Sequence, residues 1–223
     1  MTEMTSDIKH HLTDALLMGY ASGNLPEAFD LVVATHISLC DECRARLGSF
    51  EAVGGALIED TGLTADLSDA AFEKTLRLIE GGPKDPIRVA PDRPSADRVF
   101  PAPLRDYVGG DLDAVRWRSI AGGVKQAVLP TSKDATVRLL AIPGGAAMPD
   151  HGHHGTELTL VLQGAFKDDG ERFGRGDIEV ANEDLHHTPI AEDGALCICL
   201  AATDAPLRFK GFLPRIAQRF IGI

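Results

Sequence analysis

The chain has 223 residues, with 33 acidic and 22 basic side chains and a formal net charge of −11. That length allows one large domain or two small ones, and the negative charge argues against direct binding to nucleic acid, which requires a basic surface. No apolar run approaches the ~20 residues that cross a bilayer, and the polar segment 1–9 lacks the apolar centre of a secretion signal. We therefore expect a cytoplasmic protein that contacts no membrane. The four cysteines are too few for a disulfide scaffold.

The first part of the chain has the apolar spacing of helices. We expect helices over 8–20, 26–39 and 41–58. A fourth helix should begin after Ser68, a favourable N-cap residue, and end at the glycine pair 81–82.

The composition changes after the fourth helix. Six of the 13 prolines lie between 83 and 103, where we expect neither helix nor central strand but a semi-extended linker. From 111 onward, short runs of Val, Ile and Leu alternate with turn residues every ~8–12 positions, which favours a β-sandwich or barrel. The expected strands are 116–120, 124–129, 136–142, 157–163, 177–180 and 195–202, with a short helix over 215–220.

The predicted fold class is therefore multidomain α and β. It comprises a helical bundle over 1–82, a proline-rich linker over 83–110 and a β domain over 111–223. Residues 1–80 carry 14 acids and 5 bases, a net charge of −9, whereas the rest of the chain carries −2. The acidic surface of the helical domain is either simply solvated or faces a basic partner, whose encounter it would accelerate.

The first chemical signal is the spacing His36-x3-Cys40-x2-Cys43. In a reducing compartment this spacing favours a metal ion over a disulfide, and zinc prefers four tetrahedral Cys and His ligands. The fourth ligand must come from another element, and the histidines within reach are His10 and His11. Apolar periodicity does not choose between these two. A redox Cys-x-x-Cys usually follows a strand, and none is expected here.

The second signal lies in GAAMPDHGHHGTELTLVLQG, residues 145–164. His151 and His153 are two apart and share one face of a strand, Glu157 follows on the next strand, and His186 or His187 returns a third imidazole. Three histidines and one carboxylate suit Zn, Mn, Fe, Ni or Cu.

A pair of cysteines, Cys197 and Cys199, shares one face of an expected strand. Buried cysteines commonly pack as small apolar residues. The alternative is a pair that faces the barrel interior and is open to oxidation. A disulfide between them is disfavoured, because their side chains stand parallel and separated.

Both signals resemble known families. THISLCDECRARL, with the upstream histidine pair, resembles the zinc-binding anti-sigma domain of bacteria, and the spacing Gly-x5-His-x-His-x3-Glu-x6-Gly resembles the cupin motif. A zinc anti-sigma domain, a linker and a C-terminal cupin occur together in ChrR-type anti-sigma factors. By this resemblance, the zinc ligands would be His11, His36, Cys40 and Cys43, and the cupin ligands would be His151, His153, Glu157 and His187.

The resemblance also implies a function. It predicts a regulator, not an enzyme, that holds an extracytoplasmic-function sigma factor inactive and responds through the cupin to singlet oxygen and other oxidants. The apolar stripe Phe72, Leu76 and Ile79 of the fourth helix would pack either on that partner or on the other three helices. The rival interpretation is a metal-dependent cupin enzyme of the dioxygenase type, because such a ligand set can leave positions open for substrate.

Overall fold

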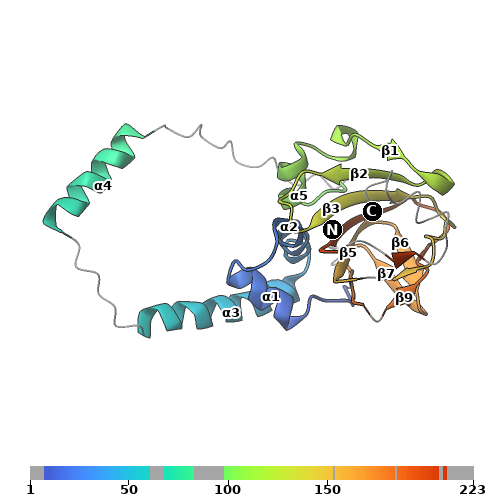
Figure 1. Ribbon diagram of the computed structural model, residues 1–223, viewed down its shortest axis with the longest axis horizontal. Coiled ribbons are helices and arrows are strands. Elements are labelled where there is room, and N and C mark those ends of the chain that lie inside the picture. Colours follow the sequence, from blue (N-terminus) through green and yellow to red (C-terminus); the bar gives the residue numbers. More distant parts are fainter. Residues whose placement is uncertain are drawn as a thin grey trace, which may run out of the picture.

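The computed structural model describes residues 8–60, 68–82, 98–152, 154–183, 185–205 and 208–209 (Figure 1). Its N-terminal part is helical and its C-terminal part consists of antiparallel sheets, which confirms the predicted fold class. The predicted C-terminal helix lies outside the described residues, as does most of the predicted linker.

The four N-terminal helices are α1 (Asp14–Ala21), α2 (Glu27–Ile37), α3 (Asp41–Asp60) and α4 (Asp69–Gly81). The last three match the predicted ranges, but α1 begins six residues later than predicted. Thr13 is its N-cap, and the Thr13 hydroxyl accepts a hydrogen bond from the Leu16 amide at 3.3 Å. The segment before Thr13 is not helical, so the prediction of a helix that includes His10 and His11 was wrong.

A fifth helix, α5 (Ala102–Val108), begins inside the proline-rich stretch. The prediction of no helix there was wrong at this end, because Pro101 is the N-cap and Pro103 lies in the first turn, where a missing N–H costs nothing. Phe100 and Leu104 are buried in the main core. The domain boundaries at 82 and 110 stay predictions.

The described residues of the β part form three sheets. Six strands form the largest sheet in the order β1-β2-β3-β11-β5-β8, and two three-stranded sheets have the orders β10-β6-β7 and β12-β4-β9. All pairings between these strands are antiparallel. The strands are β1 (Arg118–Ser119), β2 (Lys125–Leu129), β3 (Thr136–Ile142), β4 (His151–Gly152), β5 (Glu157–Gln163), β6 (Ala165–Asp168), β7 (Glu171–Gly174), β8 (Ile178–Ala181), β9 (His186–His187), β10 (Ile190–Ala191), β11 (Cys197–Thr203) and β12 (Arg208–Phe209).

The six-stranded sheet has two different faces, because side chains alternate along each strand. On one face, Leu139, Leu160 and Leu200 belong to a single core cluster with buried residues of the helices, and α2 packs across β11, β5 and β3. On the other face, Val161 and Cys199 pack with Phe166 and Phe173 of the small sheet. The helices and the sheet therefore share one hydrophobic core.

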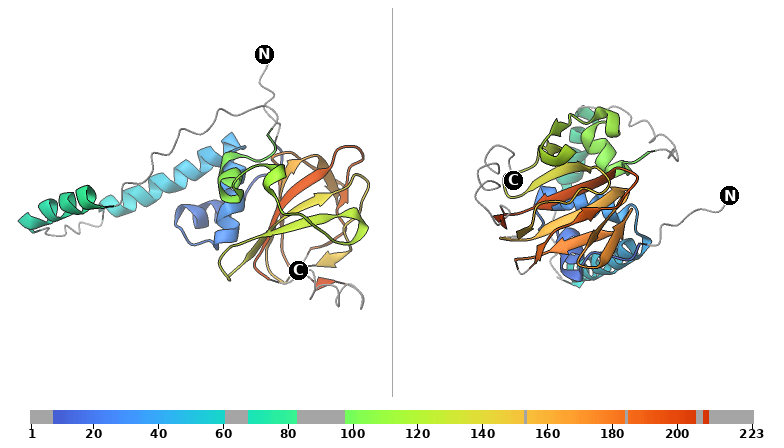
Figure 2. Two further views of the ribbon diagram at one scale, coloured as in Figure 1. Left: turned by 90° about the horizontal axis from the view of Figure 1, so that it is seen from above. Right: turned by 90° about the vertical axis from the view of Figure 1, so that its right-hand side faces the viewer.

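Two helical segments extend away from this core. α3 runs beyond the other helices, and α4 stands apart from both the bundle and the sheets (Figures 1 and 2). Several large apolar side chains on these segments are exposed: Val53, Leu57, Ile58, Phe72, Leu78 and Ile79.

Candidate metal centres and the junction beside them

The first candidate metal centre joins three elements of the helical part. His11 comes from the segment before α1, His36 from the last turn of α2, and Cys40 and Cys43 from the start of α3. One ligand atom from each of the four residues lies within 4.8 Å of the others. His11 Nδ1 is 3.3 Å from Cys40 Sγ and 3.6 Å from Cys43 Sγ. These four residues could hold a metal ion.

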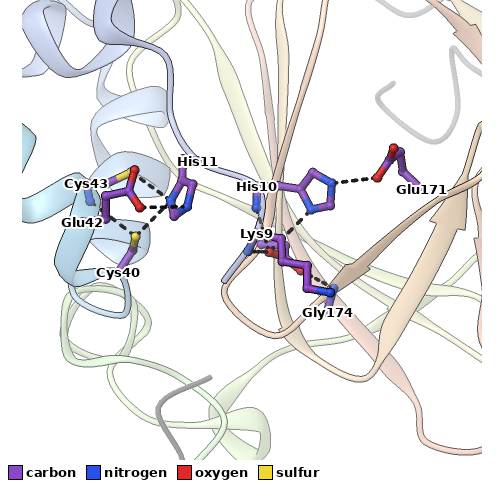
Figure 3. A network of polar contacts seen from close by, with 9 residues as sticks. Lys9, His10, His11, Cys40, Glu42, Cys43, Glu171 and Gly174 are labelled. Carbon is purple, nitrogen blue, oxygen red and sulfur yellow. Dashed lines mark hydrogen bonds and ion pairs between the residues drawn. The ribbon is translucent and has the colours of Figure 1, made fainter. Parts of the chain in front are cut away.

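The structure distinguishes between the two adjacent histidines. The imidazole of His11 points toward the thiols of Cys40 and Cys43, whereas the imidazole of His10 points away from them toward Glu171 (Figure 3). Adjacent residues of an extended segment face opposite sides, so only one of them can join the cluster.

The buried imidazole of His36 fits a metal ion. Its side chain has no exposed surface, and neither ring nitrogen has a hydrogen-bond partner among the described residues. Burial lowers the pKa of His36 to about 4, although the nearby Gly176 backbone and Asp177 act in the opposite direction. A neutral imidazole with an unsatisfied nitrogen is costly in a core and is what a metal ion requires.

The thiols also have surroundings that suit a metal ion. Burial raises the pKa of Cys43 to about 11, so metal binding must expel a proton. The Cys43 amide donates to Cys40 Sγ at 3.4 Å. Glu42 Oε2 lies 3.3 Å from His11 Nε2, the ring nitrogen other than the one that contacts the thiols. A carboxylate in that place fixes the ring orientation of a metal-binding histidine.

The second predicted centre is only partly described. His151 of β4 and His187 of β9 are directly opposite each other in the sheet, and Glu157 begins β5. His153 and the side chain of His151 lie outside the described part of the chain. Burial raises the pKa of Glu157 to about 7, while the charge of His187 lowers it. This ligand set therefore remains a prediction.

The structure places two carboxylates beside His187 that the sequence reasoning missed. Asp168 Oδ2 is 2.7 Å from His187 Nδ1, and Glu179 Oε1 is 3.8 Å from the same nitrogen. All three residues are buried and could themselves hold a metal ion. Burial opposes the charged form of His187, but Glu179 and Asp168 together raise its pKa to about 9. Of the two adjacent histidines, His187 is buried and His186 is exposed.

The cysteine pair in β11 lies on the interior face of the sheet, with both side chains buried. The sulfur atoms of Cys197 and Cys199 are 3.6 Å apart and not bonded. The hydrogen bond with Cys197, together with burial, raises the pKa of Cys199 well above its ordinary value.

The predicted stripe on α4 has little cover from the described residues. Phe72 and Ile79 are 68% and 71% exposed, and Leu76 is half-buried. Packing on the other three helices, one of the two predicted roles, is therefore not what the structure shows. No helix among the described residues has the length and apolarity needed to span a bilayer.

Comparisons with known proteins agree over nearly the whole chain. Residues 106–205 match the family described as the ChrR cupin-like domain. The chain is 59% identical over 216 residues to the anti-sigma-E factor ChrR of Cereibacter sphaeroides, which covers 97% of this chain and 99% of that protein. It is also similar to the crystal structure of Rhodobacter sphaeroides SigE in complex with the anti-sigma ChrR, with 57% identity and a TM-score of 0.76, covering 88% of this chain and 99% of that one.

Proposed function

The chain belongs to the ChrR family of anti-sigma factors, and we propose that it binds an extracytoplasmic-function sigma factor in the cytoplasm and holds it inactive. Its role is regulatory and not enzymatic. The chain would act on transcription through its bound partner and not by contacting nucleic acid directly, because a chain of net charge −11 is unsuited to such contact.

The exposed apolar face of α4 is the observation that carries this proposal. Monomeric proteins rarely leave such a face uncovered, and a helix with apolar residues at i, i+4 and i+7 is a common docking element. Phe72, Leu76 and Ile79 have this spacing. The exposed side chains Val53, Leu57 and Ile58 on the outer half of α3 extend the apolar surface. A relative with 57% identity has been solved in complex with SigE.

Charge supports the same partner class. The net charge of −9 over residues 1–80 complements the basic surfaces with which a sigma factor reads DNA. Complementary charge accelerates encounter and disfavours acidic competitors.

Zinc supplies the scaffold in this proposal. His11, His36, Cys40 and Cys43 would provide four protein ligands, and a closed tetrahedral site of that kind is structural. When bound, the ion would tie the segment before α1 to α2 and α3, and thereby set the direction in which α3 projects.

The sheets of the β part, which we call the barrel, would serve as the sensor of singlet oxygen and related oxidants. Its metal ion, Zn or one of Mn, Fe, Ni and Cu, would be held by His151, His153, Glu157 and His187. When bound, the ion would supply a Lewis-acid centre, and the chain would supply its ligands together with Asp168, which accepts a hydrogen bond from the His187 ring.

Co-purification tests the docking face. The tagged chain is coexpressed with the extracytoplasmic-function sigma factors of its own genome, and we expect one to be retained at a 1:1 ratio. The double variant Phe72→Ala, Ile79→Ala should lose the partner. Leu78→Ala, an exposed residue on another face of the same helix, should retain it. If neither variant changes retention, α4 is not the docking element.

A second experiment tests the scaffold. Cys40→Ala combined with Cys43→Ala should lose the zinc of the helical part and the partner together. Cys197→Ala, which removes a thiol from the barrel, should keep both. A double variant that still inhibits transcription would contradict the scaffold role of zinc.

A further inference from the structure

One carboxylate of the barrel fastens the segment that carries His11. Asp177 Oδ1 accepts hydrogen bonds from the amides of Lys9 at 2.7 Å and His10 at 3.0 Å, and its Oδ2 accepts from the Gly174 amide at 2.8 Å. The Ile178 amide in turn donates to the His10 carbonyl at 3.3 Å. Asp177 is only 4% exposed, so these bonds form largely away from water.

The imidazole of His10 adds a second attachment to the same sheet. Its ring lies over Phe173 with a centroid distance of 4.2 Å. Its Nε2 is 3.3 Å from Glu171 Oε2 (Figure 3). Phe173 and Glu171 both belong to β7. His10 is therefore held by the barrel through its backbone and through its ring.

These contacts matter for the zinc site because His11 has no helix to hold it. α1 begins only at Asp14, so no helical hydrogen bonds orient the backbone of His11. The same turn of the barrel also borders His36, since Gly176 and Asp177 both act on the pKa of that imidazole. The turn between β7 and β8 thus lies near His36 and binds the residue before His11.

We propose that Asp177 is a positioning residue of the zinc site, which sets the segment 9–11 so that His11 reaches the thiols while His10 stays on the barrel. Zinc affinity in the helical part then depends on a residue of the barrel. Orientation by residues outside the ligand set commonly changes metal affinity 10- to 100-fold.

The same hairpin that holds His10 also reaches His187. Phe173 stacks on Phe166 at 4.9 Å, and Asp168, two residues after Phe166 on β6, accepts from His187. A displacement of the His187 side chain would therefore be transmitted through β6 and β7 to the contacts that hold residues 9–10. This consequence rests on the proposed sensor function, whereas the positioning role of Asp177 does not.

The test is a Co²⁺ titration of the chelator-treated full chain without any partner. Thiolate charge-transfer absorption reports Co²⁺ at Cys40 and Cys43 and is silent for a barrel site built from imidazoles and carboxylates. We expect Asp177→Asn to raise the apparent Kd about tenfold. Asp111→Asn is the matched control, because Asp111 likewise accepts from three backbone amides, which belong to Val99, Phe100 and Leu112 and not to residues 9–11. The control should bind like the wild type.

Two further variants separate positioning from a general loss of folding. His10→Ala should weaken Co²⁺ binding, and His10→Phe, which keeps a ring over Phe173, should restore it. Thermal unfolding of each metal-free variant checks that the chain still folds. Equal Kd values for Asp177→Asn and the wild type would overturn the proposal, as would equal losses in Asp177→Asn and Asp111→Asn. Because no sigma factor is present, the result stands whether or not co-purification succeeds.

Discussion

His10 and His11 are adjacent in the chain, but their imidazoles serve different parts of the molecule. His10 Nε2 lies 3.3 Å from Glu171 of the barrel, whereas His11 Nδ1 lies 3.3 Å from Cys40 Sγ at the start of α3. A single peptide bond therefore joins a contact of the barrel to a candidate metal ligand. Any displacement of the backbone at His10 therefore also displaces His11.

Glu42 should strengthen metal binding by contacting the second nitrogen of the His11 ring. With Glu42 Oε2 at 3.3 Å from Nε2, the proton of the neutral ring stays on Nε2 and Nδ1 is left for the metal ion. Since the Glu42 side chain is largely exposed, we expect Glu42→Gln to weaken Co²⁺ binding only a few-fold.

The matched control for this prediction is Asp41→Asn. Asp41 is the neighbouring acid on α3 and pairs with Arg44, not with His11. Its substitution should leave the Co²⁺ Kd unchanged. If both variants weaken binding equally, the effect comes from the net charge near the site and not from the ring of His11.

The buried His36 should make the metal-free protein sensitive to acid. Its pKa is about 4 in the folded chain and 6.5 when unperturbed, so the unfolded chain binds more protons between these values. The neutral His36 therefore does not lower the free energy of unfolding above pH 6.5. As the pH falls through about 4, the free energy of unfolding decreases by at most about 3 kcal/mol, because the unfolded chain binds the proton more tightly.

Urea unfolding in excess chelator measures this effect. The free energy of unfolding is compared between the wild type and His36→Gln from pH 7 to pH 4. The comparison is needed because burial raises the pKa of Glu157, which has the opposite pH slope over part of the range. The free energy of unfolding of the wild type, taken relative to that of His36→Gln, should decrease as the pH falls from 7 to 4. A constant difference would show that His36 does not titrate as described.

The identities of most candidate ligands could be predicted because their spacing is local. His36, Cys40 and Cys43 lie within two turns of chain, and the geometry of a helical hairpin suffices to bring them together. The choice between His10 and His11 depends on Asp177, which is 167 residues from His10 in sequence. Helical periodicity was the wrong pattern there, because tertiary hydrogen bonds to Asp177 and Ile178 hold the segment outside the helix.

The polar residues around His187 show the same limit. Asp168 precedes a tight turn in which Asp169 has a φ of 47°, so its sequence context indicates a loop and not a partner for a histidine. Only the pairing of β6 with β7 and β10 brings Asp168 into the interior. α5 was missed for a different reason, since the rule that proline breaks helices does not apply in their first turn.

Asp168 should control how tightly the barrel holds its metal ion. It accepts from His187 Nδ1 at 2.7 Å, so His187 Nε2 is the nitrogen that a metal ion would take. We expect Asp168→Asn to weaken metal retention at the barrel about tenfold. Metal content after dialysis against graded chelator concentrations measures it, with the Co²⁺ thiolate band as an internal reference for the other site.

Asp169→Asn is the control for the Asp168 variant. Asp169 is the next residue, and asparagine tolerates its positive φ of 47°. This variant should retain metal like the wild type. If Asp168→Asn instead leaves retention unchanged, the buried pair of Asp168 and His187 serves only the fold.

The shared core predicts that the helices and the barrel unfold together. Leu200 on β11 has no exposed surface and lies in the core cluster that joins the sheet to α2. Leu200→Ala should lower the free energy of unfolding by about 2–5 kcal/mol, since it leaves a cavity between the two layers.

Two spectroscopic signals measure the two parts separately. Far-ultraviolet circular dichroism follows the helices, and the fluorescence of Trp117, the one tryptophan of the chain, follows the β part. Both urea transitions should shift by the same amount, whereas Val128→Ala, on an exposed position of β2, should change either by about 0.5 kcal/mol or less. A helical transition that stays in place while the fluorescence transition shifts would show that the two parts fold independently.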